Sequence, residues 1–157
     1  MTQERIHKTC DQYVEDFENA EKQVIKKPNE VYLTGVDLGT ACIVLVVLDQ
    51  EKNIVAGAHR YADVIRDGMV VDYIGAIHIV RELKEELEAK LDTELLYAAA
   101  AIPPGTDVLD GGAIKNVVQG AGFELTALLD EPTAANTIVG YWRWYNRDFD
   151  FEGWQSC

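Results

Sequence analysis

Basic residues are scarce in this chain. Lysine and arginine together number 14 against 27 aspartates and glutamates, so the formal net charge is −13 over 157 residues. Proteins that hold nucleic acid without regard to its sequence depend on lysine and arginine placed against the phosphates. The composition therefore argues against a nucleic-acid partner.

Long apolar runs are also missing. No run reaches the roughly 18 residues that indicate a membrane-spanning helix, and the N-terminus is polar and charged, unlike a secretory signal. We therefore expect a cytoplasmic protein with no membrane partner. The hydrophobic share of 48% is that of an ordinary globular domain, which excludes disorder by composition.

Cysteine is limited to Cys10, Cys42 and Cys157. No two of them have the CxxC spacing, and no histidine stands at a metal-ligand offset from them. We expect reduced thiols of the kind found in cytosolic proteins, and the pattern predicts no zinc site.

Residues 3–26 have the pattern of an amphipathic helix. Their apolar positions step alternately by four and three residues, which keeps them on one narrow face: Ile6, Cys10, Tyr13, Phe17, Ala20 and Val24. Such a helix packs on its own domain or binds a partner. Fewer than four heptads make a poor coiled coil, so we favour packing on the same chain and treat residues 1–29 as helix and linker.

Three apolar segments follow, at residues 31–38, 42–48 and 54–61, with short polar turns between them. This spacing predicts an antiparallel meander. A helix is predicted from the N-cap residue Asp72 to about Leu91.

Two later apolar runs, 95–102 and 123–129, are typical of strands buried on both faces. A helix over about 106–119 separates them, and Asp130 precedes a short helix that includes Ala134, Ala135 and Asn136. The order β-β-β-α-β-α-β-α predicts an α/β protein with a mixed sheet: the meander first, then parallel βα units, with helices on both faces. This is the ribonuclease-H-like order, shared by actin-type ATPases and several nucleases.

Two motifs bring carboxylates to strand ends. Asp37 closes the first strand and is followed by Leu38-Gly39-Thr40-Ala41, a turn whose glycine lets backbone N–H groups approach a phosphate. Glu131 follows the last strand, directly before a helix start. Each motif alone also suits an ordinary hairpin turn or helix cap.

Taken together and in this order, the motifs resemble those of the actin-like and heat-shock-chaperone ATPases. The segments that carry the resemblance are Asp37–Thr40, Asp67–Tyr73, Ile102-Pro103 and Glu131–Ala135. The nearest resemblance is to the chaperone-like branch that serves ethanolamine utilisation in bacterial microcompartments. It implies ATP and Mg²⁺ as cofactors, and microcompartment-associated proteins as partners.

The resemblance also implies roles for individual residues. Asp37 would organise the metal through its water shell, and Glu131 would help hold the water or magnesium near the γ-phosphate. Backbone N–H groups of Gly39, Thr40 and Ala41 would meet the phosphates. Phosphoryl transfer depends mostly on positioning and electrostatics, so this set of groups is chemically sensible.

The sequence departs from the family pattern after residue 140. The family continues into a second, glycine-rich phosphate loop and a second lobe with an adenosine pocket. Residues 141–157 instead hold 7 of the chain's 14 aromatic residues and all three tryptophans. We therefore interpret 30–140 as the first lobe and 141–157 as an atypical aromatic tail, and expect feeble ATP binding without useful hydrolysis.

Two other functions stay open at this stage. The fold could persist in a non-catalytic interaction protein whose N-terminal helix or aromatic tail binds a partner. Less well supported is a ribonuclease-H-fold nuclease, in which Asp37 and either Asp130 or Glu131 would hold two metal ions. The acidic composition opposes a nucleic-acid substrate. The oligomeric state is not indicated.

Overall fold

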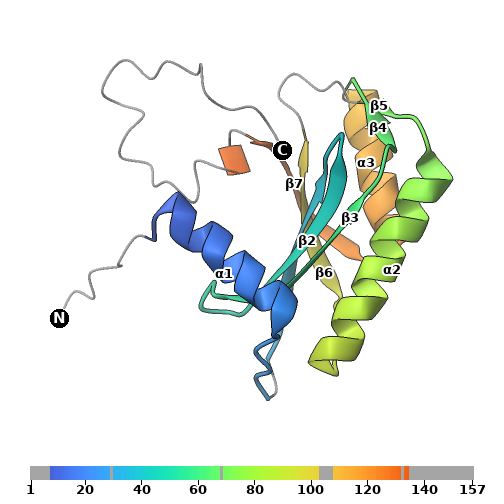
Figure 1. Cartoon of the computed structure of the whole chain (residues 1–157). Helices are drawn as coiled ribbons and strands as arrows, with labels where there is room; N and C mark the ends of the chain where they lie inside the picture. The colour runs from blue at the N-terminus through green and yellow to red at the C-terminus, as the bar shows by residue number, and fades with distance from the viewer. Residues whose placement is uncertain (1–7, 29, 68, 103–107, 132, 135–157) are drawn as a thin grey trace.

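The structure, a computed structural model, describes residues 8–28, 30–67, 69–102, 108–131, 133 and 134. These residues form a five-stranded sheet in the order β3-β2-β1-β6-β7 and a two-stranded hairpin of β4 and β5 (Figure 1). The strands are β1 (Leu33–Leu38), β2 (Cys42–Leu48), β3 (Ile54–Tyr61), β4 (Ile65–Arg66), β5 (Met69–Val70), β6 (Tyr97–Ile102) and β7 (Glu124–Asp130).

The pairing of the strands confirms the predicted mixed sheet. β1 pairs with β2 and β2 with β3, both antiparallel, which is the expected meander. β6 then joins β1 in parallel, and β7 joins β6 in parallel. The apolar runs at 95–102 and 123–129 are therefore strands, but the prediction that both of their faces are buried was wrong. Only alternate residues of β6 are buried, and β7, the last strand in the described sheet, has no fully buried residue.

Helices cover both faces of this sheet. α2 (Tyr73–Leu91) and α3 (Val108–Gly120) pack on one face, and α1 (Cys10–Lys22) lies on the other (Figure 1). Fully buried side chains of the two packed helices and of the strands make the core between them: Leu83, Leu87, Ile114, Val117, Ile43, Leu45 and Val47. This burial of apolar area supplies the main stabilisation of the fold.

α1 packs on its own domain, which is the alternative that its sequence pattern favoured. Its start is fixed by a capping box in which Gln12 N–H donates to Thr9 Oγ1 (3.3 Å) and Thr9 N–H donates to Gln12 Oε1 (2.7 Å). The ring of Phe17 lies on Gly57 of β3, so closely that a Cβ there would stand 2.5 Å from Phe17 Cε2. Because Gly57 has no Cβ, α1 can pack closely on the sheet at this position.

The helix is shorter than the sequence predicted. It ends at Lys22, not near residue 26, because the chain turns extended and Ile25 N–H donates to the Val55 carbonyl (2.8 Å). A contact with β3 has replaced the last helical turn. The helix also begins later than predicted, at Cys10, since Lys8 and Thr9 are not helical; residues 3–7 lie outside the described residues.

The β4–β5 hairpin was not predicted from the sequence. Asp67 adopts a left-handed φ of 52°, which suits a tight hairpin turn. After it, Asp72 caps α2 as predicted, accepting a hydrogen bond from Gly75 N–H (2.8 Å).

Some predicted features fall outside the described residues. These are the start of the third helix near residue 106, Ala135 and Asn136, and the whole aromatic segment 141–157. The division into 1–29, 30–140 and 141–157 stays a prediction. Within the described part of the chain, no helix combines the length and hydropathy needed to cross a bilayer.

One buried hydroxyl in β1 predicts a stabilising substitution. Thr34 is 2% exposed, and its Oγ1 has no hydrogen-bond partner among the described residues. An unsatisfied buried hydroxyl costs about 1–3 kcal/mol, so Thr34→Val is expected to raise the free energy of unfolding, measured in urea. Thr126→Val is the control, since Thr126 Oγ1 donates to the Ala98 carbonyl (3.0 Å) and its loss should not stabilise. An unchanged or lower stability of Thr34→Val would contradict this reading.

Candidate functional site

The carboxyl ends of the parallel strands bring two acidic residues to one edge of the sheet. Asp37 is the penultimate residue of β1 and stands opposite Ala101 of β6, which in turn stands opposite Leu129 of β7. Glu131 follows β7 directly. Ligands of open α/β sheets bind outside these strand ends, so the structure places Asp37 and Glu131 where the sequence argument required them.

The two carboxyl groups influence each other electrostatically. Desolvation by the surrounding protein raises the pKa of Asp37, although the residue keeps an exposed surface. Desolvation also raises the pKa of Glu131, and the nearby charge of Asp37 raises it further. Two like charges held close together without a cation are costly, so this edge of the sheet favours a positive ligand.

The hairpin between β1 and β2 supplies fewer amides than the sequence suggested. Gly39 N–H donates to the Cys42 carbonyl (3.0 Å) and so closes the turn. A Cβ at Gly39 would lie 2.9 Å from that same oxygen, which is why the position needs glycine. The Gly39 amide is therefore occupied, and Thr40 and Ala41 at the tip are the ones that can face a phosphate.

Asp130, next to Glu131, has a structural task. Its Oδ1 accepts from Thr133 N–H and its Oδ2 from Thr133 Oγ1, both at 2.8 Å. These hydrogen bonds lower the pKa of Asp130. The carboxylate caps the helical turn that begins at Glu131 and so fixes the place of Glu131 at the sheet edge.

The donor set suits a hard cation that keeps much of its water. Carboxylate oxygens are the ligands that Mg²⁺ takes, and it commonly binds through one or two of them while phosphates and water fill the remaining positions. Among the described residues no group of three or more histidine, cysteine, aspartate or glutamate side chains could hold a metal. Asp37 and Glu131 thus fit a metal that arrives with a phosphate ligand.

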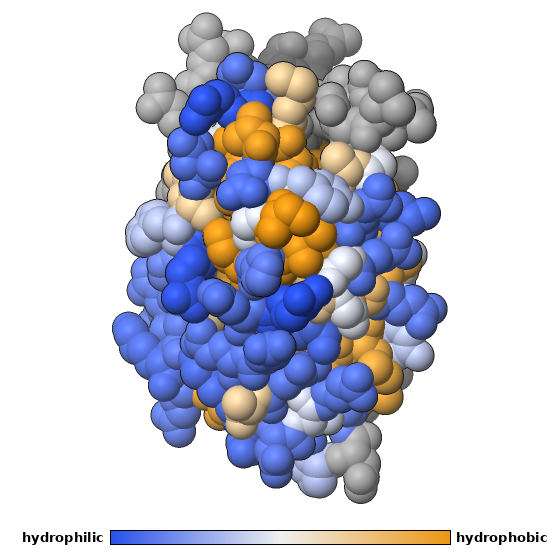
Figure 2. All heavy atoms as spheres, turned by 90° about the vertical axis from the view of Figure 1, so that its right-hand side faces the viewer, coloured by the Kyte–Doolittle hydropathy of each residue, from blue (hydrophilic) through white to orange (hydrophobic). Residues whose placement is uncertain are grey.

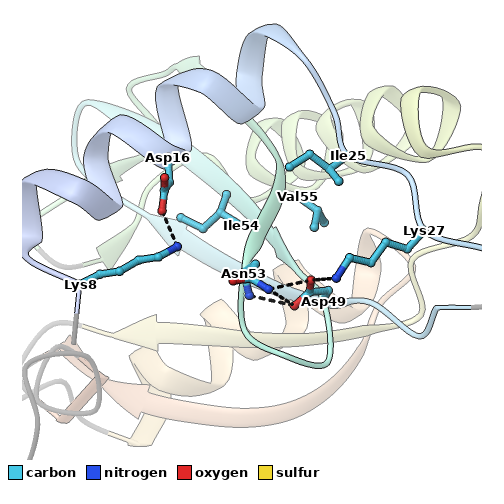
Figure 3. A pocket seen from close by; sticks show the side chains of 8 residues that line it. All are labelled: Lys8, Asp16, Ile25, Lys27, Asp49, Asn53, Ile54 and Val55. Carbon is cyan, nitrogen blue, oxygen red and sulfur yellow. Dashed lines mark hydrogen bonds and ion pairs between the residues drawn. The ribbon is translucent and has the colours of Figure 1, made fainter. Parts of the chain in front are cut away.

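A separate pocket of about 270 Å³ lies at the opposite edge of the sheet, between α1 and the β2–β3 turn (Figure 3). Its charged side chains pair with one another: Lys8 Nζ with Asp16 (2.7 Å), and Lys27 Nζ with Asp49. Asp49 is fully buried and also accepts from Asn53 N–H (2.8 Å). This cluster ties the linker after α1 to the sheet.

This cluster was not predicted from the sequence, in which residues 49–53 have only the pattern of a polar turn. One signal was available, namely an aspartate at the first position of a turn with an asparagine four residues on, which is typical of a side chain that caps its own loop. Its partner Lys27 stands 22 positions away, and no local pattern announces that pairing.

The meander, the parallel strands β6 and β7 and the helices on both faces define the mixed sheet of the ribonuclease-H-like, actin-type fold. Within that class, the chain is related to the ethanolamine utilization protein EutJ. It is 44% identical over 105 residues to EutJ of Escherichia coli (strain K12) and, to the same extent, to EutJ of Salmonella typhimurium (strain LT2).

Solved structures agree with this relationship. The crystal structure of EutJ from Carboxydothermus hydrogenoformans is 52% identical, with a TM-score of 0.76 over 82% of this chain. A chain of the PilM–PilN type IV pilus biogenesis complex matches 67% of this chain and 49% of its own length, with a TM-score of 0.50 at 13% identity. At that identity the likeness concerns the fold alone.

The matches cover only part of these relatives. The chain spans 37% of the length of the curated EutJ proteins and 48% of the EutJ structure, while the curated matches cover 67% of this chain. No family model matches the sequence. The activity of the longer relatives is therefore carried over to this chain only as a proposal.

Proposed function

We propose that this chain is the first, ATP-binding lobe of a chaperone-like actin/DnaK-type ATPase of ethanolamine utilisation. The observation that carries the proposal is that two carboxyl groups, Asp37 and Glu131, lie at the carboxyl ends of parallel strands in one sheet. Mg²⁺, when bound with the nucleotide, would neutralise their charge and that of the phosphates. Asp37 would hold the metal through water, and Glu131 would hold the water or metal on the γ-phosphate side.

The hairpin tip supports the phosphate part of this proposal. The N–H groups of Thr40 and Ala41 donate to no described residue in the turn, whereas Gly39 N–H is engaged with Cys42. Each hydrogen bond to a charged group is worth about 1.5–3 kcal/mol, and ordering the ligand costs several kcal/mol. Two such bonds and a metal bridge give a dissociation constant on the order of millimolar at best.

These residues alone are not expected to hydrolyse ATP. They would contact one side of the phosphates, and a γ-phosphoryl transfer needs groups around the whole reacting centre. Microcompartment-associated proteins as partners and a cytoplasmic location are proposed from the EutJ relationship alone.

A non-catalytic interaction protein with the same fold is the second candidate. It is favoured by the exposed apolar side chains of β5 and of the beginning of α2, which suit a protein partner. The nuclease alternative loses a ligand, because both oxygens of Asp130 are engaged by Thr133. A measured affinity for nucleotide at the carboxyl ends of the strands distinguishes the ATP-binding lobe from the non-catalytic interaction protein.

Titration with Mg-ATP, followed by amide NMR shifts, tests the proposal. We expect progressive shifts at Thr40, Ala41 and Glu131, with a dissociation constant on the order of millimolar. Asp37→Asn should weaken the binding and remove its dependence on Mg²⁺. Glu124→Gln, at the opposite end of β7, is the matched control and should bind as the parent does.

Two results would contradict the proposal. The first is an absence of amide shifts at Thr40 and Ala41 at Mg-ATP concentrations up to roughly 10 mM. This result would favour the non-catalytic interaction protein. Equal weakening by Glu124→Gln and Asp37→Asn would mean that net charge, and not this site, governs the affinity.

A further inference from the structure

Exposed apolar side chains gather on β5 and the beginning of α2. Of the eleven large hydrophobic side chains exposed among the described residues, four fall within six consecutive positions, and we call them the 69–74 patch: Met69, Val71, Tyr73 and Ile74. Figure 2 views the side of the molecule on which α2 and the hairpin lie. Hydrophobic side chains gather in the upper half of that view, and mostly hydrophilic ones lie below them. Scattered exposed apolar residues are ordinary, but a contiguous group marks an interaction site.

The 69–74 patch sits on a well-anchored support. Val64 and Ile65, at the start of the hairpin, are buried in the core. The carbonyl of Val64 accepts hydrogen bonds from the N–H groups of Val71 (2.9 Å) and Asp72 (3.3 Å). A surface held this way is ordered before it binds, so little conformational entropy is lost on binding.

The charges around the patch indicate what it binds. Asp67 and Asp72 are exposed beside it, and the neighbouring Asp63 is paired with Arg66 (2.9 Å). The segment 63–74 carries three aspartates and one arginine, and the whole chain has a net charge of −13. A second copy would set one acidic rim against another, whereas a basic partner would find complementary charge.

We propose that the 69–74 patch is a docking surface for an amphipathic, basic segment of a partner protein. Apolar side chains of the partner would pack on Val71 and Ile74, and its lysines or arginines would face Asp67 and Asp72. The surface lies on the hairpin and on the beginning of α2, and it shares no residue with the Asp37–Glu131 pair.

A designed peptide of leucine and lysine at helical spacing is the probe, with binding to the full chain followed by fluorescence anisotropy. Ile74→Ser is expected to weaken binding about tenfold, a change of roughly 1.4 kcal/mol. Val14→Ser is the matched control, since Val14 on α1 is 60% exposed and Ile74 is 64% exposed. It should bind within about a factor of two of the parent, well under that 1.4 kcal/mol.

A peptide with glutamate in place of lysine is expected not to bind. Equal loss in Val14→Ser and Ile74→Ser, or equal binding of the two peptides, would overturn the proposal. So would a concentration-dependent dimer, seen by analytical ultracentrifugation and removed by Ile74→Ser, because it would assign the patch to a second copy of the chain. Circular dichroism confirms that both variants are folded.

Discussion

Replacing Asp49 with alanine is expected to lower the free energy of unfolding by about 2–3 kcal/mol at neutral pH, since hydrogen bonds to charged groups are each worth about 1.5–3 kcal/mol. The buried carboxylate accepts from Lys27 Nζ and from the Asn53 N–H (2.8 Å) and Nδ2 (3.1 Å). Its removal leaves the Asn53 N–H without this acceptor, and leaves Lys27 Nζ and Asn53 Nδ2 with only the exposed Glu51 Oε2, at 3.4 Å from each. The linker after α1 is thereby loosened. Urea unfolding of the full chain measures the loss.

Glu51→Ala is the control for this prediction. Glu51 pairs with the same Lys27 Nζ (3.4 Å), but its side chain is 77% exposed. Exposed ion pairs contribute about 0–1 kcal/mol, so this variant should stay close to the parent. Equal losses at positions 49 and 51 would show that the burial of Asp49 has no special value.

The loss at Asp49 also has a pH dependence. Burial alone would raise the pKa of Asp49, but the hydrogen bonds from Lys27 and Asn53 outweigh it and hold the pKa below the ordinary value. A folded-state pKa below the unfolded one stabilises the protein above the unfolded value of about 4. That contribution disappears as the pH falls through the folded pKa, so the difference between parent and variant should shrink in acid.

Asp37→Asn is expected to act in the opposite direction and make the fold more stable at pH 7. Desolvation raises the pKa of Asp37, and the same carboxylate raises the pKa of Glu131. A folded-state pKa above the unfolded one means that stability falls as the pH rises through that interval. The amide variant escapes this penalty, so its unfolding midpoint should exceed that of the parent at pH 7 and match it near pH 3, below the ordinary carboxyl pKa of about 4.

Asp130→Asn provides a control of opposite sign. Hydrogen bonds from Thr133 lower the pKa of Asp130, so neutralising that carboxylate should reduce stability at pH 7. Chemical unfolding across pH 3–8 compares the variants over the interval in which carboxyl groups near pKa 4 titrate. A destabilised Asp37→Asn would mean that this carboxylate supports the fold, and the case for a ligand site at the sheet edge would lose its electrostatic basis.

Local patterns were enough to predict most of the strands and their directions. The continuous apolar runs at 42–48, 95–102 and 123–129 predicted strands from side-chain chemistry alone. The parallel order of β1, β6 and β7 then brought Asp37 and Glu131 to one end of the sheet, while their role as a site stays a prediction. Helix ends were predicted less well: α1 begins at its capping box, later than expected, and its end depends on the contact of Ile25 with β3.

Other features were decided only by tertiary structure. The pairing of Lys27 with Asp49 and the packing of Phe17 on Gly57 join residues that are distant in sequence. The exposure of the 69–74 patch depends on which surfaces the rest of the chain covers. The Gly39 amide, which the motif offered to a phosphate, donates to the Cys42 carbonyl once the hairpin closes. The sequence by itself determined which segments form strands and where the acids stand along them, because hydrophobic patterns are local. Only the fold decided which polar groups meet and which apolar ones stay exposed, because that depends on packing across the chain.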